Sequence, residues 1–419
     1  MHNREFFKNI AKLMLGTAFG KVVAFIAIPI ITRLYNPSDF GILASFTSLV
    51  TILAGISTFR YCVALPLPRV DKTAYYLLNG CIAILLINTI SLYILLIFQG
   101  DNIMKLMGME EIENYVLLIP ISVGLLGFYE VLVNFFIRKR NYSLIAKVTL
   151  FQSIFGNLVK ILLGLIFNGP LGLITGQLLS QFGGGIIYIK VEYKNIIKSF
   201  SLYRIKRILA CYISFPIFRL PSQACLLLST NMPILYFSSF YGTSSTGQLG
   251  LALMTIGLPI GLIGNSVSKA YYGEIANLGV NKNKEIFSLS CQLLKKLVVI
   301  SIIPFFTLFF FSELIYSIVF GSEWIIAGKY SAILCIYLVF NLISSPFVNI
   351  LNILNLNGIF LWVNITRLLL LLAVFYLSYY LEYSEYVTLY NYSLVLSFHY
   401  VFVAILCFWK LNELKKHRT

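Results

Sequence analysis

Long apolar runs alternate with short polar connectors along almost the whole chain. A run of roughly 20 apolar residues is long enough to cross about 30 Å of hydrocarbon as a helix, and a helix satisfies its own backbone hydrogen bonds there. The strict two-residue alternation of a barrel strand is absent from these runs. The pattern therefore predicts an all-α integral membrane protein of about 12 transmembrane helices, near 10–31, 41–62, 77–98, 115–137, 148–167, 171–190, 217–240, 248–268, 291–312, 330–354, 359–381 and 386–408.

The longest predicted cytoplasmic connector, 190–208, divides these spans six and six. We predict two six-helix bundles, 1–205 and 206–419, with the connector as a helix on the membrane surface. The two halves begin alike: Pro29 is followed after twelve residues by Gly41, and Pro233 after fourteen by Gly247. Repeats of six helices keep the same orientation, which predicts a pseudo-two-fold axis along the membrane normal and a substrate site between the halves.

Composition supports the membrane class and sets the orientation. Charged residues make up 11% of the 419 residues, against about 25% in soluble domains. Of the 32 Lys and Arg residues, 25 lie in segments on the side of the N-terminus and three in the opposite loops. This bias predicts that both termini are cytoplasmic and that the net charge of +16 meets anionic lipid, not nucleic acid. The first span is expected to be an uncleaved helix. Cysteines and histidines show no metal-site spacing, so we expect no cofactor or metal.

The polar turn after the first span, "TRLYNPSDFG", has the residues of a helix start. Asn36 suits the N-cap, Pro37 the first helical position and Asp39 the first turn, where an acid favours the helix dipole. Arg33 is expected to reach the membrane surface from the end of the first span and can pair with Asp39.

Five ionisable residues fall inside predicted spans: Lys21, Glu130, Lys160, Arg219 and Arg367. A charge at the bilayer centre costs at least about 2.5–3.5 kcal/mol, so such residues usually line an interior pathway. One acid cannot neutralise four bases, which predicts an anionic ligand such as phosphate or pyrophosphate. Arg219 and Arg367 lie nearer the cytoplasmic ends, where anchoring at the surface is the alternative. Glu130 either pairs with a base or couples transport to H+ or Na+.

Amide side chains accompany the deep cations. Asn157 lies three residues before Lys160 on one stripe of its predicted helix, and Gln177 and Gln181 are one turn apart in the next span. Such amides either bind a glycan or join neighbouring helices, and the sequence leaves both readings open.

Two stretches, "GTAFGKVVAFIAIPIITRLYNPSDFG" (16–41) and "FRYCVALPLP" (59–68), resemble the opening of bacterial O-antigen flippases, the Wzx-type polysaccharide transporters. The resemblance covers about 60 residues, and the spacing after Ala64 departs slightly from the family pattern. It rests on Gly16-Thr17, Pro29, Thr32 to Tyr35, Pro37, Phe40-Gly41, Arg60-Tyr61, Ala64, Leu65 and Pro66.

The resemblance implies the multidrug/oligosaccharidyl-lipid/polysaccharide (MOP) exporter fold and alternating access in the bacterial inner membrane. The implied substrate is an undecaprenyl-pyrophosphate-linked oligosaccharide of O-antigen, lipopolysaccharide or a related polysaccharide. It would move from the cytoplasmic to the periplasmic leaflet, with membrane lipids, a polymerase and a chain-length regulator as partners. Lys21, Lys160, Arg219 and Arg367 would hold the pyrophosphate, and Arg60 would belong to the cytoplasmic gate.

Two other functions remain open from the sequence. An ion-coupled multidrug exporter should hold several buried carboxylates for cationic drugs, and Glu130 alone qualifies. A membrane polysaccharide polymerase would need a large external loop or paired acids for a sugar nucleotide, and neither is visible. We therefore expect a transporter and not an enzyme.

Overall fold

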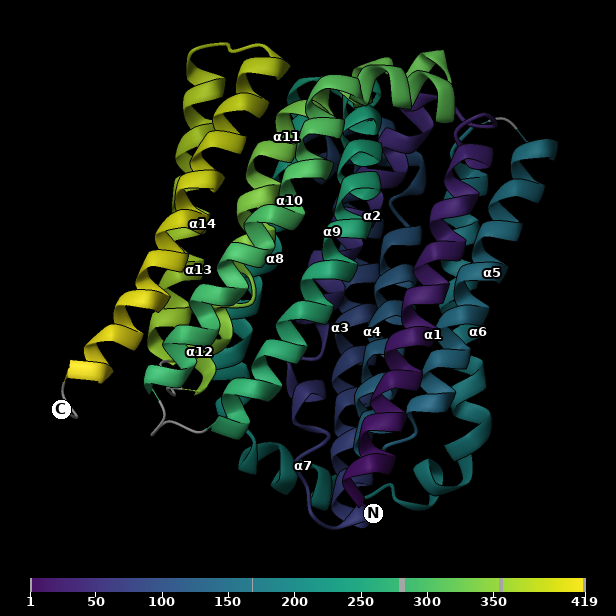
Figure 1. Cartoon of the computed structure of the whole chain (residues 1–419). Helices are drawn as coiled ribbons and strands as arrows, with labels where there is room; N and C mark the ends of the chain where they lie inside the picture. Colours follow the sequence, from purple (N-terminus) through teal and green to yellow (C-terminus); the bar gives the residue numbers. More distant parts are fainter. Residues whose placement is uncertain (1, 168, 279–282, 354–356, 417–419) are drawn as a thin grey trace. The chain divides into compact units, whose positions relative to one another are not determined.

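The predicted apolar runs correspond to twelve helices of 20 or more residues in the computed structural model, which describes all residues except 1, 168, 279–282, 354–356 and 417–419 (Figure 1). These helices are α1 (His2–Ile31), α2 (Pro37–Ser57), α3 (Asp71–Leu106), α4 (Leu118–Arg138), α5 (Tyr142–Ile166), α6 (Leu171–Lys198), α8 (Leu220–Phe240), α9 (Gly242–Leu278), α10 (Asn283–Val319), α11 (Ile325–Ser344), α13 (Asn357–Tyr380) and α14 (Glu385–Lys416).

Length and hydropathy confirm a multi-pass membrane protein. Among the described residues, nine helices are long and apolar enough to cross a membrane. A bent pair, Leu202–Cys211 with Phe215–Phe240, brings the number to ten if the pair is counted as one broken span, and Ala18–Ile31 of α1 is a shorter apolar helix. The predicted fold class is thus confirmed, whereas the pseudo-two-fold axis stays a prediction.

The chain divides into two compact units, Met1–Gly247 and Gln248–Thr419. The first unit holds α1 to α8 and the start of α9, and the second unit holds the rest of α9 and α10 to α14. The predicted division at 205/206 separates two sequence repeats, whereas these units are separated by their packing contacts. The division into repeats stays a prediction.

In the first unit, α5 packs against both α1 and α6, while α2 packs against α4 and α8 (Figure 1). A buried aromatic cluster lies where α4 meets α6: the rings of Phe136 and Tyr188 stack with centroids 4.8 Å apart. In the second unit, α11 packs against α10 and α14, and α13 packs on α14. These contacts bring together α5 and α6, which carry Lys160 and Gln177, and place α14 against both α11 and α13.

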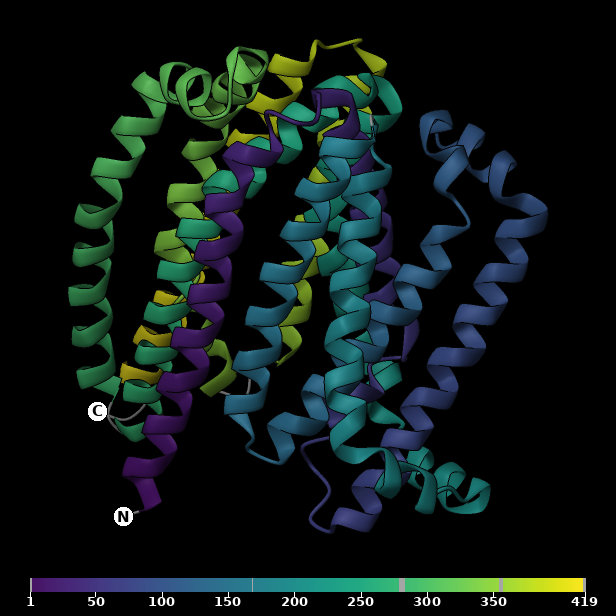
Figure 2. The same ribbon diagram turned by 90° about the vertical axis from the view of Figure 1, so that its right-hand side faces the viewer.

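The connector between the halves differs from the prediction. Helix α6 runs on to Lys198, and a separate helix, α7 (Leu202–Cys211), follows it, bent by 53° from the segment Phe215–Phe240. The position of α7 on the membrane surface stays a prediction. The Asn79 side chain of α3 donates hydrogen bonds to the Ile196 and Ser199 carbonyls at 3.0 and 3.1 Å and so ends α6. The N-terminal part of α3, around Gly80, also packs against Ile205 and Leu209 of α7 (Figures 1 and 2).

The predicted start of α2 is confirmed by a capping box. The Asp39 backbone N–H donates to Asn36 Oδ1 at 2.8 Å, and the Asn36 N–H donates to Asp39 Oδ2 at 3.2 Å. The predicted Arg33–Asp39 pair is wrong, since no ion pair joins these two described residues. The carboxylate is buried and engaged with the backbone, while Arg33 is exposed.

The two glycines of the repeated openings lie at one tight helix crossing in the first unit. A Cβ atom at Gly41 would overlap the Thr243 carbonyl, and one at Gly247 would overlap the Pro37 carbonyl. Pro37 and Gly41 are four residues apart, as are Thr243 and Gly247, so each helix presents one face of the crossing. Both positions require glycine because the opposing atoms are backbone, which cannot move aside.

Candidate functional site

Lys160 and Gln177 meet between α5 and α6. The Lys160 Nζ donates a hydrogen bond to Gln177 Oε1 at 3.1 Å. The lysine stem crosses α6 at Gly176, where a Cβ atom would lie 2.5 Å from Lys160 Cγ. The structure thus joins two predicted site residues that come from different spans.

Tyr35 fixes the backbone of Lys160. Its hydroxyl donates to the Lys160 carbonyl at 2.7 Å, and its ring fills the space left by Gly164 and Gly172. Burial, assisted by the nearby charge of Asp39, raises the pKa of Tyr35 to about 12. The phenol therefore stays protonated at neutral pH and keeps its hydrogen bond.

The charge of Lys160 has no acid beside it. Lys160 makes no ion pair with a described residue, and an ammonium group can donate three hydrogen bonds. One turn before it, Asn157 donates to the Ser153 carbonyl at 2.8 Å within the same helix. The buried Gln181 Oε1 has no hydrogen-bond partner. The ammonium group of Lys160 on α5 and the Gln181 Oε1 atom on α6 can thus bind a ligand.

Arg60 and Glu130 form the second joined pair. Their Nη1 and Oε1 atoms lie 2.9 Å apart, and the side chains are 14% and 32% exposed. Arg60 follows α2 with a left-handed backbone (φ 60°) and also donates to the Gly55 carbonyl at 3.4 Å. The pairing expected as one alternative for Glu130 is therefore present, and its coupling role stays a prediction.

In the second unit, Arg367 on α13 is an unpaired cation. Its guanidinium carbon lies 5.6 Å from the ring centroid of Tyr400, and its buried Nε has no hydrogen-bond partner. The buried Asn364 Nδ2, one turn earlier, has none either. Arg367 forms no ion pair with a described residue, so this face offers donors to an anion.

The remaining predicted cations are not joined to these groups. The Lys21 side chain is exposed on α1, next to Gly20, which packs on Thr149 and Ser153 of α5. Arg219 is exposed at the end of a π-helical turn, Phe215–Arg219. Neither side chain bonds to a described residue, and their predicted roles stay predictions.

A charged cluster that the sequence analysis missed joins α3, α4 and α6. The Tyr75 hydroxyl donates to Glu192 Oε2 at 2.5 Å, Lys139 Nζ donates to the Tyr75 hydroxyl at 3.0 Å, and Lys139 also pairs with Glu192. Burial lowers the pKa of Lys139, but these two partners outweigh it, so the net pKa is raised. The available signal was Glu192 itself, the single acid between residues 131 and 273.

Known proteins resemble the chain in sequence and in fold. The model of a family described as "Polysaccharide biosynthesis protein" matches residues 30–329. A comparison with curated proteins finds no match.

Three solved structures illustrate the fold. An inward-facing MATE-family multidrug resistance transporter of the MOP superfamily is 15% identical, with 96% of this chain and 98% of that chain covered and a TM-score of 0.70. The lipid II flippase MurJ, in an inward closed conformation, is 16% identical with coverage of 95% and 89% and the same TM-score. A MOP-superfamily transporter from Pyrococcus furiosus, whose binding pocket is described as having reverse polarity, is 14% identical with coverage of 97% and 96% and a TM-score of 0.61. The fold is that of MOP-superfamily transporters.

Proposed function

Because the chain belongs to the polysaccharide biosynthesis protein family and has the MOP-superfamily transporter fold, we propose that it is a flippase for a lipid-linked oligosaccharide. It moves an undecaprenyl-pyrophosphate-linked repeat unit of O-antigen or a related polysaccharide from the cytoplasmic to the periplasmic leaflet by alternating access. The fold match to MurJ, itself a lipid II flippase, supports a lipid-linked substrate.

The observation that carries this proposal is the unpaired Lys160 in α5. A lysine inside a span is costly unless something neutralises it, and its partner here is the neutral Gln177. A diphosphate supplies the missing negative charge, while hydroxyl groups of a glycan suit the Asn157 and Gln177 amides. In this proposal Lys21, Arg219 and Arg367 add positive charge along the path of the same headgroup.

The Arg60–Glu130 pair suits ion coupling. Glu130 is the one carboxylate within the predicted spans, so it is the candidate for binding a coupling ion. Its charge is balanced by Arg60. Binding of H+ or Na+ at Glu130 would weaken this pair and release a left-handed segment at the end of α2. Arg60 then acts in the cytoplasmic gate, with Arg33 and Asp39 belonging to the turn that starts α2.

The proposed location is the bacterial inner membrane with both termini in the cytoplasm. The distribution of Lys and Arg supports this orientation. A polysaccharide polymerase and a chain-length regulator would receive the flipped unit on the periplasmic side.

A multidrug exporter is the second candidate, because the MATE structure matches with the same TM-score as MurJ. Against it stands the charge of the candidate sites. Cationic drugs need free carboxylates, whereas Glu130 is paired and Lys160 and Arg367 are unpaired cations.

The test follows the leaflet of the oligosaccharide. In cells that lack this chain but keep its biosynthetic enzymes, we expect complete units trapped in the cytoplasmic leaflet. The intact chain should restore export, and a Lys21→Ala/Lys160→Ala double variant should not. Lys147→Ala, an exposed lysine on α5, is the matched control. Export by the double variant equal to that of the intact chain would refute the cation site, and complete units already outside in the deleted cells would indicate a polymerase.

A further inference from the structure

We infer that a chloride ion, or another small monovalent anion, binds to Arg367 inside the second unit when no substrate headgroup is bound there. The ion lies between α11, α13 and α14, all of which belong to this unit. The inference goes beyond the proposed function and does not rest on it, because that proposal is carried by Lys160 in the first unit.

Two buried donors on one face of α13 have no hydrogen-bond partner. They are the Nε of Arg367 and the Nδ2 of Asn364, which lie three residues apart and are therefore neighbours on the helix surface. Asn364 is only 6% exposed, so its side chain is shielded from solvent. Buried polar groups in proteins are nearly always hydrogen-bonded, and two neighbouring exceptions therefore indicate an acceptor that binds between them.

Tyrosine rings border the guanidinium of Arg367. Its central carbon lies 5.6 Å from the ring centroid of Tyr400 on α14, and that ring stacks on Tyr337 of α11 with centroids 6.5 Å apart. The centroids of Tyr337 and Tyr392 lie 5.5 Å apart, and both residues are close enough to Arg367 for their charges to interact. Tyr337 and Tyr392 are 6% and 3% exposed, so these rings place the guanidinium beside the interior of the unit.

The rings add a donor to the site but no negative charge. Tyr337 and Tyr392 share one hydrogen bond, so the hydroxyl that accepts this bond keeps its own proton to donate. The face of Tyr400 attracts the guanidinium through its quadrupole, which does not neutralise the charge. Guanidinium, amide and phenol groups thus meet at one place as donors, and such a set binds an anion.

No carboxylate of these three helices lies at the level of Arg367. Helices α11 and α13 contain neither Asp nor Glu. The acids of α14 are Glu385 and Glu413, each about 20 Å along the helix from Tyr400. A guanidinium within a membrane span is costly without a counter-charge, and a bound anion removes this cost.

The charge of the site favours a monovalent ion over a phosphate. Arg367 is the one Lys or Arg residue of α13, so a single negative charge balances it. A phosphate or diphosphate would leave surplus negative charge beside the buried side chains of Asn364, Tyr337 and Tyr392, which is unfavourable. A monoatomic ion also accepts hydrogen bonds from any direction, which suits donors that come from different helices.

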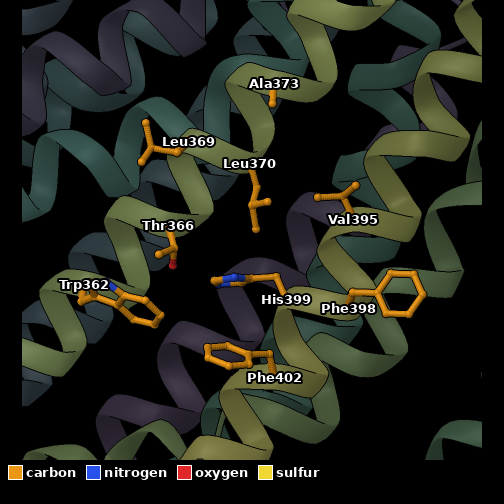
Figure 3. A pocket seen from close by; sticks show the side chains of 9 residues that line it. All are labelled: Trp362, Thr366, Leu369, Leu370, Ala373, Val395, Phe398, His399 and Phe402. Atoms are coloured by element: carbon orange, nitrogen blue, oxygen red, sulfur yellow. The ribbon is translucent and has the colours of Figure 1, made fainter.

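The apolar groove between α13 and α14 is separate from this site. Figure 3 shows Thr366 and His399, the residues that precede Arg367 and Tyr400 in the chain, facing one another across the groove. The Thr366 hydroxyl donates to the Val363 carbonyl at 3.0 Å, so it is already bonded within its own helix. Arg367 does not line the groove. The anion therefore binds to the donors of the interior and not to the groove.

Thermal unfolding of the full chain in a neutral detergent tests for the ion. Sodium gluconate is replaced by sodium chloride at constant ionic strength, so that neither Na+ nor screening changes. We expect chloride to raise the unfolding temperature by about 3 °C and the effect to saturate. Bromide should act like chloride, and sulfate like gluconate. Equal unfolding temperatures in chloride and gluconate would overturn the inference.

Arg367→Gln and Asn364→Leu should each abolish the difference between chloride and gluconate. Each variant is compared with itself in the two salts, so a lower stability of the variant does not affect the comparison. Arg69→Gln removes an exposed arginine of the first unit and is the matched control, which should keep the full difference. A chloride effect that persists in Arg367→Gln would place the ion elsewhere and refute the site.

Anomalous diffraction from crystals grown in bromide locates the ion without any variant. We expect a peak beside Arg367 Nε and Asn364 Nδ2, and ordered side chains without such a peak would contradict the inference. Phosphatidylglycerol added in gluconate tests a lipid phosphate as the source of the charge. If it stabilises the chain as much as chloride does, and only when Arg367 is present, a lipid headgroup binds there and the inference is wrong.

Failure of this inference can be told apart from failure of the proposed function. Absence of a chloride effect, with export that depends on Lys21 and Lys160, would refute the ion alone. A chloride effect that depends on Arg367, together with full export by the Lys21→Ala/Lys160→Ala variant, would refute the cation site of the proposed function and leave the ion.

Discussion

Arg60 Nη1 lies 2.9 Å from Glu130 Oε1, so the arginine that follows α2 binds a carboxylate in the middle of α4. The contact spans 70 positions of the chain, and Arg60 has a left-handed backbone conformation with φ 60°. A non-glycine residue at positive φ is strained, and such residues cluster at functional sites, so we expect this pair to have a use beyond stability.

Glu130→Gln should therefore affect transport more than stability. The amide keeps the shape of the side chain but loses the charge that binds Arg60, and we expect destabilisation of about 1 kcal/mol or less. Transport should fall at least tenfold and lose its dependence on the coupling ion. Flux assays in proteoliposomes with imposed H+ or Na+ gradients measure this. Glu110→Gln, an exposed acid, is the control, and an unchanged ion dependence in Glu130→Gln would contradict the coupling role.

Gly176→Ala should displace Lys160 from Gln177. The new Cβ atom would lie 2.5 Å from Lys160 Cγ and 3.0 Å from the Gly156 carbonyl, so the lysine stem has to move. We expect a loss of stability of about 1–3 kcal/mol and weaker binding of undecaprenyl diphosphate. Gly257→Ala is the matched control, since its Cβ meets nothing within 4 Å. Equal thermal stability and ligand binding in the two variants would show that the crossing at Gly176 is not needed.

Gly41→Ala and Gly247→Ala should each disrupt the crossing of α2 with the start of α9. Their Cβ atoms would overlap backbone carbonyls, so relief requires a shift of a whole helix and not of a side chain. We expect a marked fall in the thermal unfolding temperature in detergent and loss of polysaccharide export. Gly261→Ala, with nothing within 4 Å of its Cβ, should leave both unchanged.

Local sequence predicted local structure well, and distant pairings poorly. Asn36, Pro37 and Asp39 were readable because a capping box involves neighbours within four residues. The same carboxylate explains the error at Arg33. Both the Arg33 guanidinium and the Asn36 backbone N–H could bind Asp39, and the Asn36 N–H does so.

The end of α6 shows the opposite limit. Its extent depends on Asn79, which lies 117 and 120 positions away from the carbonyls that it binds. The pattern of apolar residues predicted helical structure on both sides of this point, but it did not indicate where α6 ends and α7 begins. The sequence identified Lys160 and Arg367 because a charged residue in an apolar span is conspicuous. The hydrogen bond from Tyr35 to the Lys160 backbone and the contact of Arg367 with the Tyr400 ring became evident only from the packing.

Tyr35→Phe tests the burial of the phenol by the pH dependence of stability, and the hydrogen bond to Lys160 by the stability at pH 7. The pKa of Tyr35 is raised to about 12 from a usual value of 10, so the protonated phenol stabilises the fold. That contribution is fully present below pH 10 and is lost as the pH rises through 12. We expect the wild type to lose thermal stability between pH 10 and 12 more steeply than Tyr35→Phe, and to exceed it by about 1 kcal/mol at pH 7. Equal stability at pH 7 would mean that the bond contributes nothing, and identical profiles between pH 10 and 12 would contradict the burial of the phenol.

Cysteine labelling tests both the packing near Arg60 and the orientation of the chain. Cys62 is fully buried, and burial raises the pKa of its thiol to about 11, so it should resist maleimide at pH 7. Cys211, at the end of α7, is exposed and should react within minutes. In sealed right-side-out cells a membrane-impermeant maleimide should leave Cys211 unlabelled, and in inverted vesicles it should label it, because the basic segments around α7 are predicted to be cytoplasmic. Labelling in intact cells would reverse the proposed topology, and rapid reaction of Cys62 would contradict the packing of the Tyr61–Ala64 turn.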